Sequence, residues 1–123
     1  MAGGPFVVSR VRACLAGRLL GVNTRDRDEG ILLCCLLWAN EGQRDAMTTY
    51  EDTVLALVAD HGGVVLQRVR SDGAGGNPHE VQLYSFPNQE AIDAYLADPR
   101  RIALAEERDR VVARTHVFPV QLA

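Results

Sequence analysis

Hydrophobic and polar positions divide most of this chain into short regular elements, and the first of them is the most apolar. Residues 31–38 are eight consecutive apolar residues, Ile-Leu-Leu-Cys-Cys-Leu-Leu-Trp, and the polar turn Asn40-Glu41-Gly42 follows shortly after them. The run is too short to cross a bilayer and shows no alternation, so it predicts a strand that is covered on both faces. Because a chain of this size covers one face with its own helices, we expect a second copy of the protein on the other.

Helical regions are predicted at two places further along the chain. Apolar positions spaced by three and four residues predict an amphipathic helix over about 43–61, with Glu51 among the polar residues of its outer side. Gly62 then supplies the left-handed residue that ends this helix. In the second region, Asn88 is expected to cap a short helix, and a further helical segment is expected from its cap at residue 98 to about residue 114.

Three further strands complete the pattern. Residues 64–70 form an expected strand whose polar side chains indicate an exposed sheet edge. Residues 80–86 alternate strictly, and residues 115–122 form the last strand, at an edge because Pro119 cannot donate to a ladder. The order β-α-β-β-α-β is the split βαβ, or ferredoxin-like, arrangement of the α+β class. Right-handed crossovers place the first and third strands in the middle of a four-stranded antiparallel sheet.

The N-terminal residues differ from this pattern, so we divide the chain into an extension over residues 1–29 and a domain over residues 30–123. The apolar residues of the extension would share one face of a helix, which Gly17 and Gly21 weaken. Three interpretations stay open: a tail, a helix that packs loosely on the domain or its partner, and a processed extension.

Composition bears on the class of function and on the location of the protein. The formal net charge of −3 argues against a general grip on nucleic acid, and the sequence predicts no membrane-spanning segment. Cys14, Cys34 and Cys35 form no disulfide framework, and the last two point to opposite faces of a strand, so they cannot share a metal. All 13 basic residues are Arg, which is typical of GC-rich bacterial genomes. We therefore expect a bacterial protein in a reducing cytoplasm.

Three segments carry a likeness to known proteins. They are His61-Gly62-Gly63-Val64-Val65-Leu66, the stretch from Val81 to Asn88 that leads to Ala91, and Asp98-Pro99-Arg100 before a helix bearing Arg108. Through them, residues 31–122 resemble the dimeric α/β-barrel superfamily of ferredoxin-like proteins, and most nearly an uncharacterised small bacterial family related to the antibiotic-biosynthesis monooxygenases. The resemblance implies a homodimer with its sheets packed face to face, and a cavity between each sheet and its own helices. The chain departs from that family at an aromatic residue early in the second helical region and in a longer central loop.

Candidate site residues are those whose predicted positions border that cavity. As a pocket acid or base we consider His61 and His116, and as ligand-binding residues Trp38, Tyr50, Tyr84 and Arg108. Each has a plainer interpretation: a helix-capping histidine, core or interface packing, or a surface arginine. The three histidines have no metal-ligand spacing, so no metal or other cofactor is expected.

Two functions remain open on the sequence alone. The first is a small-molecule binding protein or enzyme with an apolar pocket between sheet and helices, for which the resemblance implies cofactor-independent oxygenation or isomerisation of a hydrophobic metabolite. The second is a non-catalytic dimer with a structural or interaction role, whose cavity is filled by its own side chains. A pocket above ~300 Å³ with convergent polar groups supports the first function, and a filled interior supports the second.

Overall fold

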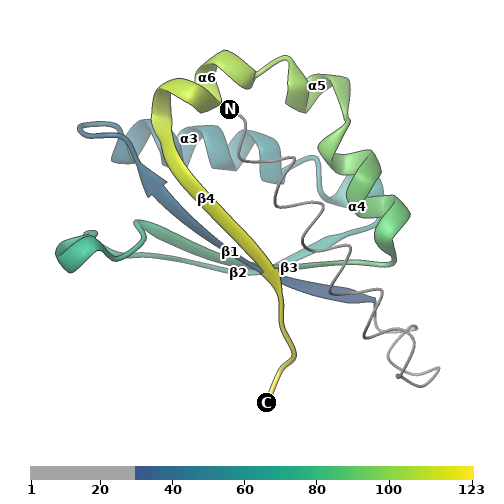
Figure 1. The fold of residues 1–123 in the computed structure, drawn as a ribbon. Coiled ribbons are helices and arrows are strands. Elements are labelled where there is room, and N and C mark those ends of the chain that lie inside the picture. The colour runs from purple at the N-terminus through teal and green to yellow at the C-terminus, as the bar shows by residue number, and fades with distance from the viewer. Residues whose placement is uncertain (1–29) are drawn as a thin grey trace.

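The computed structural model describes residues 30–123, and it confirms the predicted β-α-β-β-α-β order (Figure 1). The predicted extension over residues 1–29 lies outside the described residues. The strands are β1 (Ile31–Ala39), β2 (Val64–Arg70), β3 (Glu80–Phe86) and β4 (Val112–Pro119). The helices are α3 (Arg44–Leu55), α4 (Gln89–Leu96), α5 (Pro99–Ile102) and α6 (Ala105–Val111), with short 3₁₀ helices η1 (Ala59–His61) and η2 (Ala74–Gly76).

Within residues 30–123 the strands form a four-stranded antiparallel sheet with the order β2-β3-β1-β4. The apolar strand β1 is central, where Cys34 pairs with Leu83 of β3 on one side and with Phe118 of β4 on the other. The strands β2 and β4 are the two edges. The α+β ferredoxin-like fold, its strand order and its edge strands are therefore as the sequence predicts.

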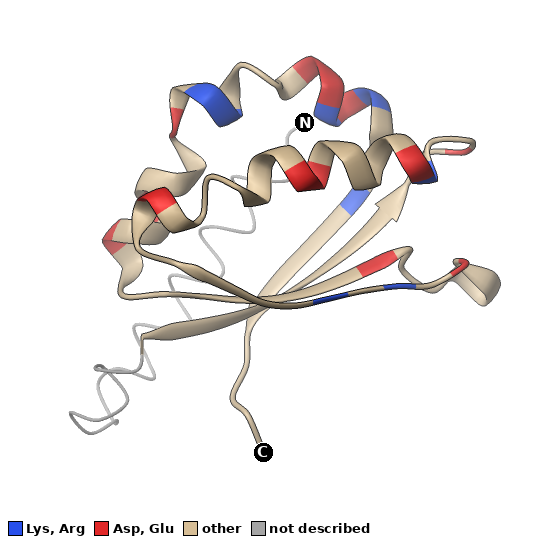
Figure 2. Ribbon diagram, turned by 180° about the vertical axis from the view of Figure 1, so that it is seen from behind, with Lys and Arg blue, Asp and Glu red and all other residues tan. Residues whose placement is uncertain are grey.

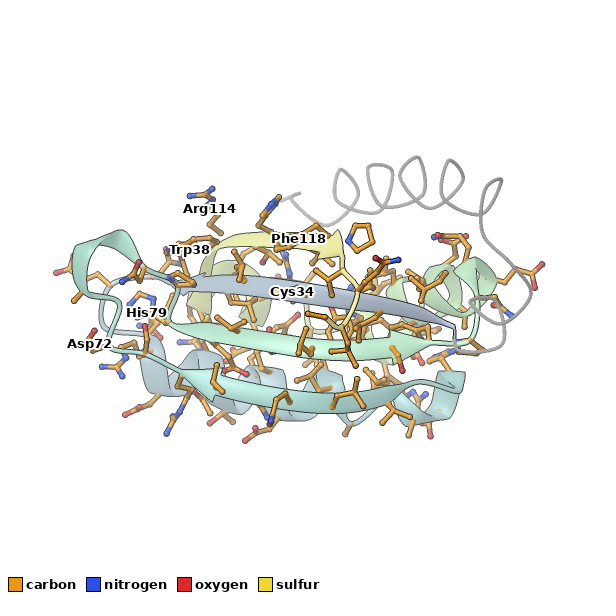
Figure 3. The ribbon with its side chains drawn as sticks, turned by 90° about the horizontal axis from the view of Figure 1, so that it is seen from below. Cys34, Trp38, Asp72, His79, Arg114 and Phe118 are labelled. Carbon is orange, nitrogen blue, oxygen red and sulfur yellow. The ribbon has the colours of Figure 1, made fainter. Side chains whose placement is uncertain are left out.

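The helices α3, α4, α5 and α6 all lie on one side of this sheet (Figure 1). Alternate residues of β1, from Ile31 to Leu37, point beneath the helices and are at most 7% exposed. The residues between them are half-buried on the opposite face, which none of the helices α3 to α6 covers (Figure 3). Figure 2 shows charged residues mainly on the helices and on β2, whereas β1 carries none. One face of the central strand is thus apolar and uncovered within the described domain.

Helix ends differ from the sequence prediction at two places. The helix α3 ends at Leu55, and the chain then turns through η1 before Gly62, whose φ of 78° confirms the predicted left-handed end. Helix ends commonly tighten into 3₁₀ geometry in this way. The last helical region breaks between α5 and α6 and ends at Val111, so β4 begins at Val112 instead of Thr115. Two consecutive buried valines favour the strand over further helix.

The predicted helix caps are confirmed. The side chain of Asn88 accepts a hydrogen bond from the Ala91 backbone N–H at 2.9 Å, at the start of α4. The side chain of Asp98 accepts one from the Arg100 N–H at 2.8 Å, with Pro99 in the first position of α5. Both caps satisfy backbone donors that the first helical turn leaves without partners.

Gly63 allows β2 to approach β3 closely, and this predicts the effect of adding a methyl group there. A Cβ at this position would lie 2.6 Å from Val58 Cγ1 and 2.7 Å from the Ser85 carbonyl oxygen. We expect Gly63→Ala to destabilise the fold by about 1–3 kcal/mol, as overpacking does. Gly42→Asn is the control, because no atom lies within 4 Å of the Cβ position there and Asn tolerates a positive φ. Urea unfolding of both variants checks this, and equal midpoints would contradict the close approach.

Candidate functional site

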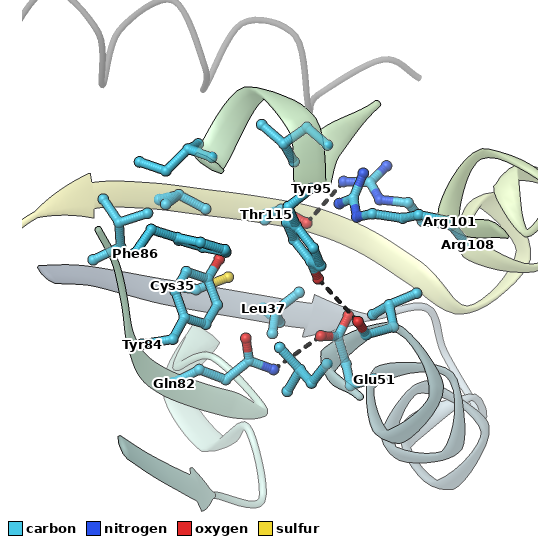
Figure 4. Close-up of a pocket in the computed structure, with 16 residues that line it drawn as sticks. Cys35, Leu37, Glu51, Gln82, Tyr84, Phe86, Tyr95, Arg101, Arg108 and Thr115 are labelled. Atoms are coloured by element: carbon cyan, nitrogen blue, oxygen red, sulfur yellow. Dashed lines mark hydrogen bonds between the residues drawn. The ribbon is translucent and has the colours of Figure 1, made fainter. Parts of the chain in front are cut away.

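A cavity lies between the helix-covered face of the sheet and the helices above it (Figure 4). Its volume is about 60 Å³ and most of its wall is apolar. One water molecule needs roughly 10–15 Å³ of cavity volume, so the cavity has room for a few waters. Pockets that bind metabolites are typically about 300 Å³ or larger. Its charged and hydrogen-bonding side chains include Glu51, Gln82, Tyr84, Tyr95, Arg101 and Arg108.

Glu51 contributes a buried carboxyl group to this cavity. It is 5% exposed, so its predicted place on the outer side of the helix is wrong. The reason is helical spacing, because Glu51 follows Met47 by four residues and precedes Val54 by three, on the buried side of α3. Gln82 Nε2 donates a hydrogen bond to Glu51 Oε1 at 2.9 Å. Burial nevertheless raises the pKa of Glu51 to about 7, because it penalises the charged form more than this bond stabilises it.

A polar chain connects Glu51 with the protein surface. The Gln82 amide also donates to Glu80 Oε2 at 3.0 Å, and Glu80 is fully buried. Arg68 bridges outward, with Nε 2.6 Å from Glu80 Oε2 and Nη1 2.6 Å from Oδ1 of the exposed Asp52. Glu80 therefore has a cationic partner within ion-pair distance, whereas Glu51 has none among residues 30–123. The missing pairing agrees with the raised pKa of Glu51, because no cation at ion-pair distance stabilises its charged form.

Two guanidinium groups approach the cavity from the second helical region. Arg101 belongs to α5, and its Cζ lies 5.1 Å from the centre of the Tyr95 ring. Its Nε is buried and forms no hydrogen bond within the described residues. Arg108 belongs to α6, and its Nη2 donates to Thr115 Oγ1 at 3.2 Å. The cavity thus combines a carboxyl group with two cations.

The phenol and thiol groups of the cavity stay protonated at neutral pH. Burial raises the pKa of Tyr95 to about 12, and it raises the pKa of Tyr84 well above its usual value. Burial likewise raises the pKa of the Cys35 thiol. The Tyr95 hydroxyl donates to the Val54 carbonyl at 3.3 Å. These groups are neutral hydrogen-bonding groups, which leaves Glu51 as the cavity residue suited to proton exchange near pH 7.

The predicted ligand-binding residues separate into two sets. Tyr84 and Arg108 line the cavity. Tyr50 is 4% exposed and packs in the core without being part of the cavity wall. Trp38 lies on the opposite face of the sheet, where its Nε1 donates to the Gly76 carbonyl at 2.9 Å and Arg114 stacks 4.3 Å above its ring (Figure 3).

Neither predicted acid–base histidine lies in the cavity wall. His61 Nε2 is 2.7 Å from Asp98 Oδ2, so the imidazole joins the end of η1 to the cap of α5. Hydrogen bonds from Arg100, and then from His61, hold the pKa of Asp98 well below its usual range. His116 pairs with Leu36 across the sheet and packs 5.0 Å from the Phe118 ring, on the face away from the helices. Catalytic roles for these histidines stay predictions, and the structure separates both from the cavity.

Residues 30–123 offer neither a candidate metal site nor a candidate membrane-spanning helix. These residues contain no group of three or more His, Cys, Asp or Glu side chains placed to hold a metal ion. No helix among them has the length and apolar character that a membrane span requires.

Known proteins resemble this chain in structure and not in sequence. No protein-family model matches the chain, and no curated protein matches it. A proposed antibiotic biosynthesis monooxygenase from Bacteroides thetaiotaomicron is 13% identical with a TM-score of 0.63, over 77% of this chain and 91% of that one. A NIPSNAP family protein of unknown function from Agrobacterium tumefaciens is 14% identical with a TM-score of 0.62, over 76% and 89%.

A third similar structure is described as dimeric. It is a ferredoxin-like protein of unknown function from Bacteroides fragilis, 12% identical with a TM-score of 0.57, over 75% of this chain and 95% of that one. Together these structures confirm the ferredoxin-like fold that the sequence resemblance implies. At such low identity the similarity establishes the fold and leaves the activity open.

The raised pKa of Glu51 predicts a pH-dependent effect of replacing it. Its pKa in the folded state, about 7, lies above the ordinary value of 4.5, so its contribution to stability is lost as pH rises between these values. Glu51→Gln keeps the shape and removes the titration. The stability of this variant relative to wild type should therefore increase by about 3 kcal/mol between pH 4 and pH 8.

Urea unfolding at a series of pH values measures this difference. Glu106→Gln provides the matched control, because Glu106 is exposed on α6 and should show little pH-dependent difference. If the stability difference between Glu51→Gln and wild type changed as little with pH as that of the control, the raised pKa of Glu51 would be contradicted.

Proposed function

We propose that this protein is a homodimer that binds a small metabolite in the cavity and uses Glu51 to move a proton. The reaction class is isomerisation or cofactor-independent oxygenation, both of which begin by removing a proton from the substrate. The observation that carries the proposal is the buried carboxyl of Glu51 in an apolar cavity, with a pKa of about 7. A general base works best when its pKa is close to the working pH.

The surroundings of Glu51 suit this chemistry. Gln82 holds one oxygen of the carboxyl at 2.9 Å, which fixes its orientation. Tyr84 also lines the cavity and remains a neutral phenol, able to donate to the oxygen of an enolate. Glu80, joined to the same amide, helps to raise the pKa of Glu51. A proton taken from a carbon next to a carbonyl would thus leave a stabilised anion, which either regains the proton elsewhere or reacts with oxygen.

The small volume favours a second candidate function. At about 60 Å³ the cavity is well below the ~300 Å³ typical of metabolite pockets, so a metabolite would enter only after side chains at the mouth shift. Leu96 and the half-buried Arg101 and Arg108 line the cavity and are candidates for such a shift. Without it, the protein would be a non-catalytic dimer with a structural or interaction role.

The uncovered face of the sheet supports the proposed homodimer. Cys34, Leu36 and Phe118 lie on this face from the two adjacent strands β1 and β4 (Figure 3). An apolar surface of this kind is typical of an interface, and a similar structure is described as dimeric. The free thiols Cys34 and Cys35 fit the reducing bacterial cytoplasm that we propose as the location.

A charge at the centre of this face tests the dimer. Cys34→Glu places a carboxylate between Leu83 and Phe118 on the central strand, and the sedimenting species should change from dimer to monomer at micromolar concentration. Gln67→Glu adds the same charge at the exposed edge strand β2 and should leave the dimer intact. Wild-type protein that sediments as a folded monomer would rule the dimer out.

Exchange of carbon-bound protons tests the chemistry. We expect wild-type protein to catalyse deuterium incorporation next to the carbonyl group in some members of a panel of small keto acids and enol lactones. The rate should rise with pH up to about 7, as Glu51 ionises. Glu51→Gln should slow it by ~100-fold or more. NMR in D₂O measures the exchange.

The histidines serve as comparison variants in the same experiment. His61→Gln and His116→Gln should exchange at close to the wild-type rate, because neither side chain lines the cavity. Loss of exchange in one of them, with Glu51→Gln unaffected, would transfer the role to that histidine. Absence of exchange and of binding across the whole panel would favour the non-catalytic dimer.

A further inference from the structure

We propose that the ligand of this cavity is a small carboxylic acid, bound as its carboxylate by Arg101 and Arg108. This inference names the substrate class of the function proposed above and rests on it. Arg68, Arg100 and Arg110 each form ion pairs with carboxylates. Arg101 and Arg108 line the cavity and form no ion pair within residues 30–123.

Other arginines also lack ion pairs within residues 30–123, but they lie in different surroundings from Arg101 and Arg108. Arg44, Arg70 and Arg114 form no ion pair with another described residue, but all three are exposed and none lines the cavity. Water satisfies such surface charges at little cost. Arg101 is different, because its Nε is buried and has no hydrogen-bond partner among the described residues. A buried donor without a partner costs free energy, and a ligand oxygen would remove that cost.

The two guanidinium groups lie on the same side of the cavity, beside Thr115 and Tyr95 (Figure 4). The Arg101 guanidinium packs over the Tyr95 ring, with its Cζ 5.1 Å from the ring centre. Arg108 uses Nη2 to donate to Thr115 Oγ1, and its other donors make no hydrogen bond in the described residues. Planar guanidinium groups with free donors match the geometry of a carboxylate, which accepts two parallel hydrogen bonds.

The charge balance of the cavity favours a ligand with one negative charge. Glu51 is the acidic residue among the lining side chains, and the charge of Glu80 is already paired with Arg68. With Glu51 ionised, as the proposed base, the two arginines leave one positive charge unbalanced among the lining residues, and one carboxylate balances it. A carboxylate bound to the arginines would leave the apolar part of the acid against the remaining wall, where Glu51 also lies (Figure 4).

Paired ligands that differ only in charge test this proposal. Crotonate and crotonamide have nearly the same shape, and we expect the carboxylate to bind wild-type protein at least about tenfold more tightly. NMR titration reports both the affinity and the position, because the Arg101 Nε–H signal should move on binding crotonate. Arg101→Gln and Arg108→Gln should each weaken crotonate binding by about tenfold or more and leave crotonamide binding unchanged. Arg44→Gln removes an equal charge outside the cavity and should have no effect.

Each outcome bears on the proposal. Equal binding of acid and amide, or no binding of either, overturns it, and this comparison needs no variant to fold. If crotonate binds and the Arg101 signal does not move, the site is elsewhere and the proposal is also overturned. The test separates this inference from the proposed chemistry, because Glu51→Gln removes the base and should keep crotonate binding. Tight carboxylate binding without any Glu51-dependent proton exchange would uphold the ligand class and refute the proposed reaction.

Discussion

The central strand β1 constrains the rest of residues 30–123, because it is apolar on both faces. Alternate residues of β1, from Ile31 to Leu37, face the helices and are nearly inaccessible to solvent. They define where the helices pack. Its other residues, with Cys34 near the middle, lie on the face that the described elements leave uncovered. The cavity forms on the covered face and the proposed dimer interface on the uncovered face. Both features therefore follow from one strand that has no polar side.

The polar chain that connects Asp52 through Arg68, Glu80 and Gln82 to Glu51 costs folding free energy, because most of it is buried. Three of its members, Glu51, Glu80 and Gln82, are buried almost completely, and buried carboxyl groups are stable only when they are paired or protonated. Arg68 pairs with Glu80, whereas Glu51 is protonated up to about pH 7. A domain that needed only a core would be more stable with apolar residues at these positions. The arrangement thus favours a role in ligand chemistry, although the small cavity requires side-chain movement for a metabolite to enter.

The sequence predicts the fold better than the site. Strand positions follow from short-range patterns, and Gly62, Asn88 and Asp98 mark element ends by local chemistry that needs no tertiary information. The site depends on which polar residue faces inward. Glu51 could have been recognised, because its spacing from Met47 and Val54 places it on the apolar side of α3. Arg101 carries no such signal, since the break between α5 and α6 that orients it is a tertiary feature.

Direct titration of the glutamate side chains tests the central claim, that the buried carboxyl of Glu51 titrates near neutral pH. Carbon-13 NMR of the carboxyl carbons, with Glu51→Gln to assign the signal, gives a pKa for each glutamate. We predict that Glu51 titrates near pH 7, well above the ordinary value of 4.5. A midpoint for Glu51 close to the ordinary value would contradict the account, because the carboxyl would then be ionised and unable to act as a base tuned to neutral pH.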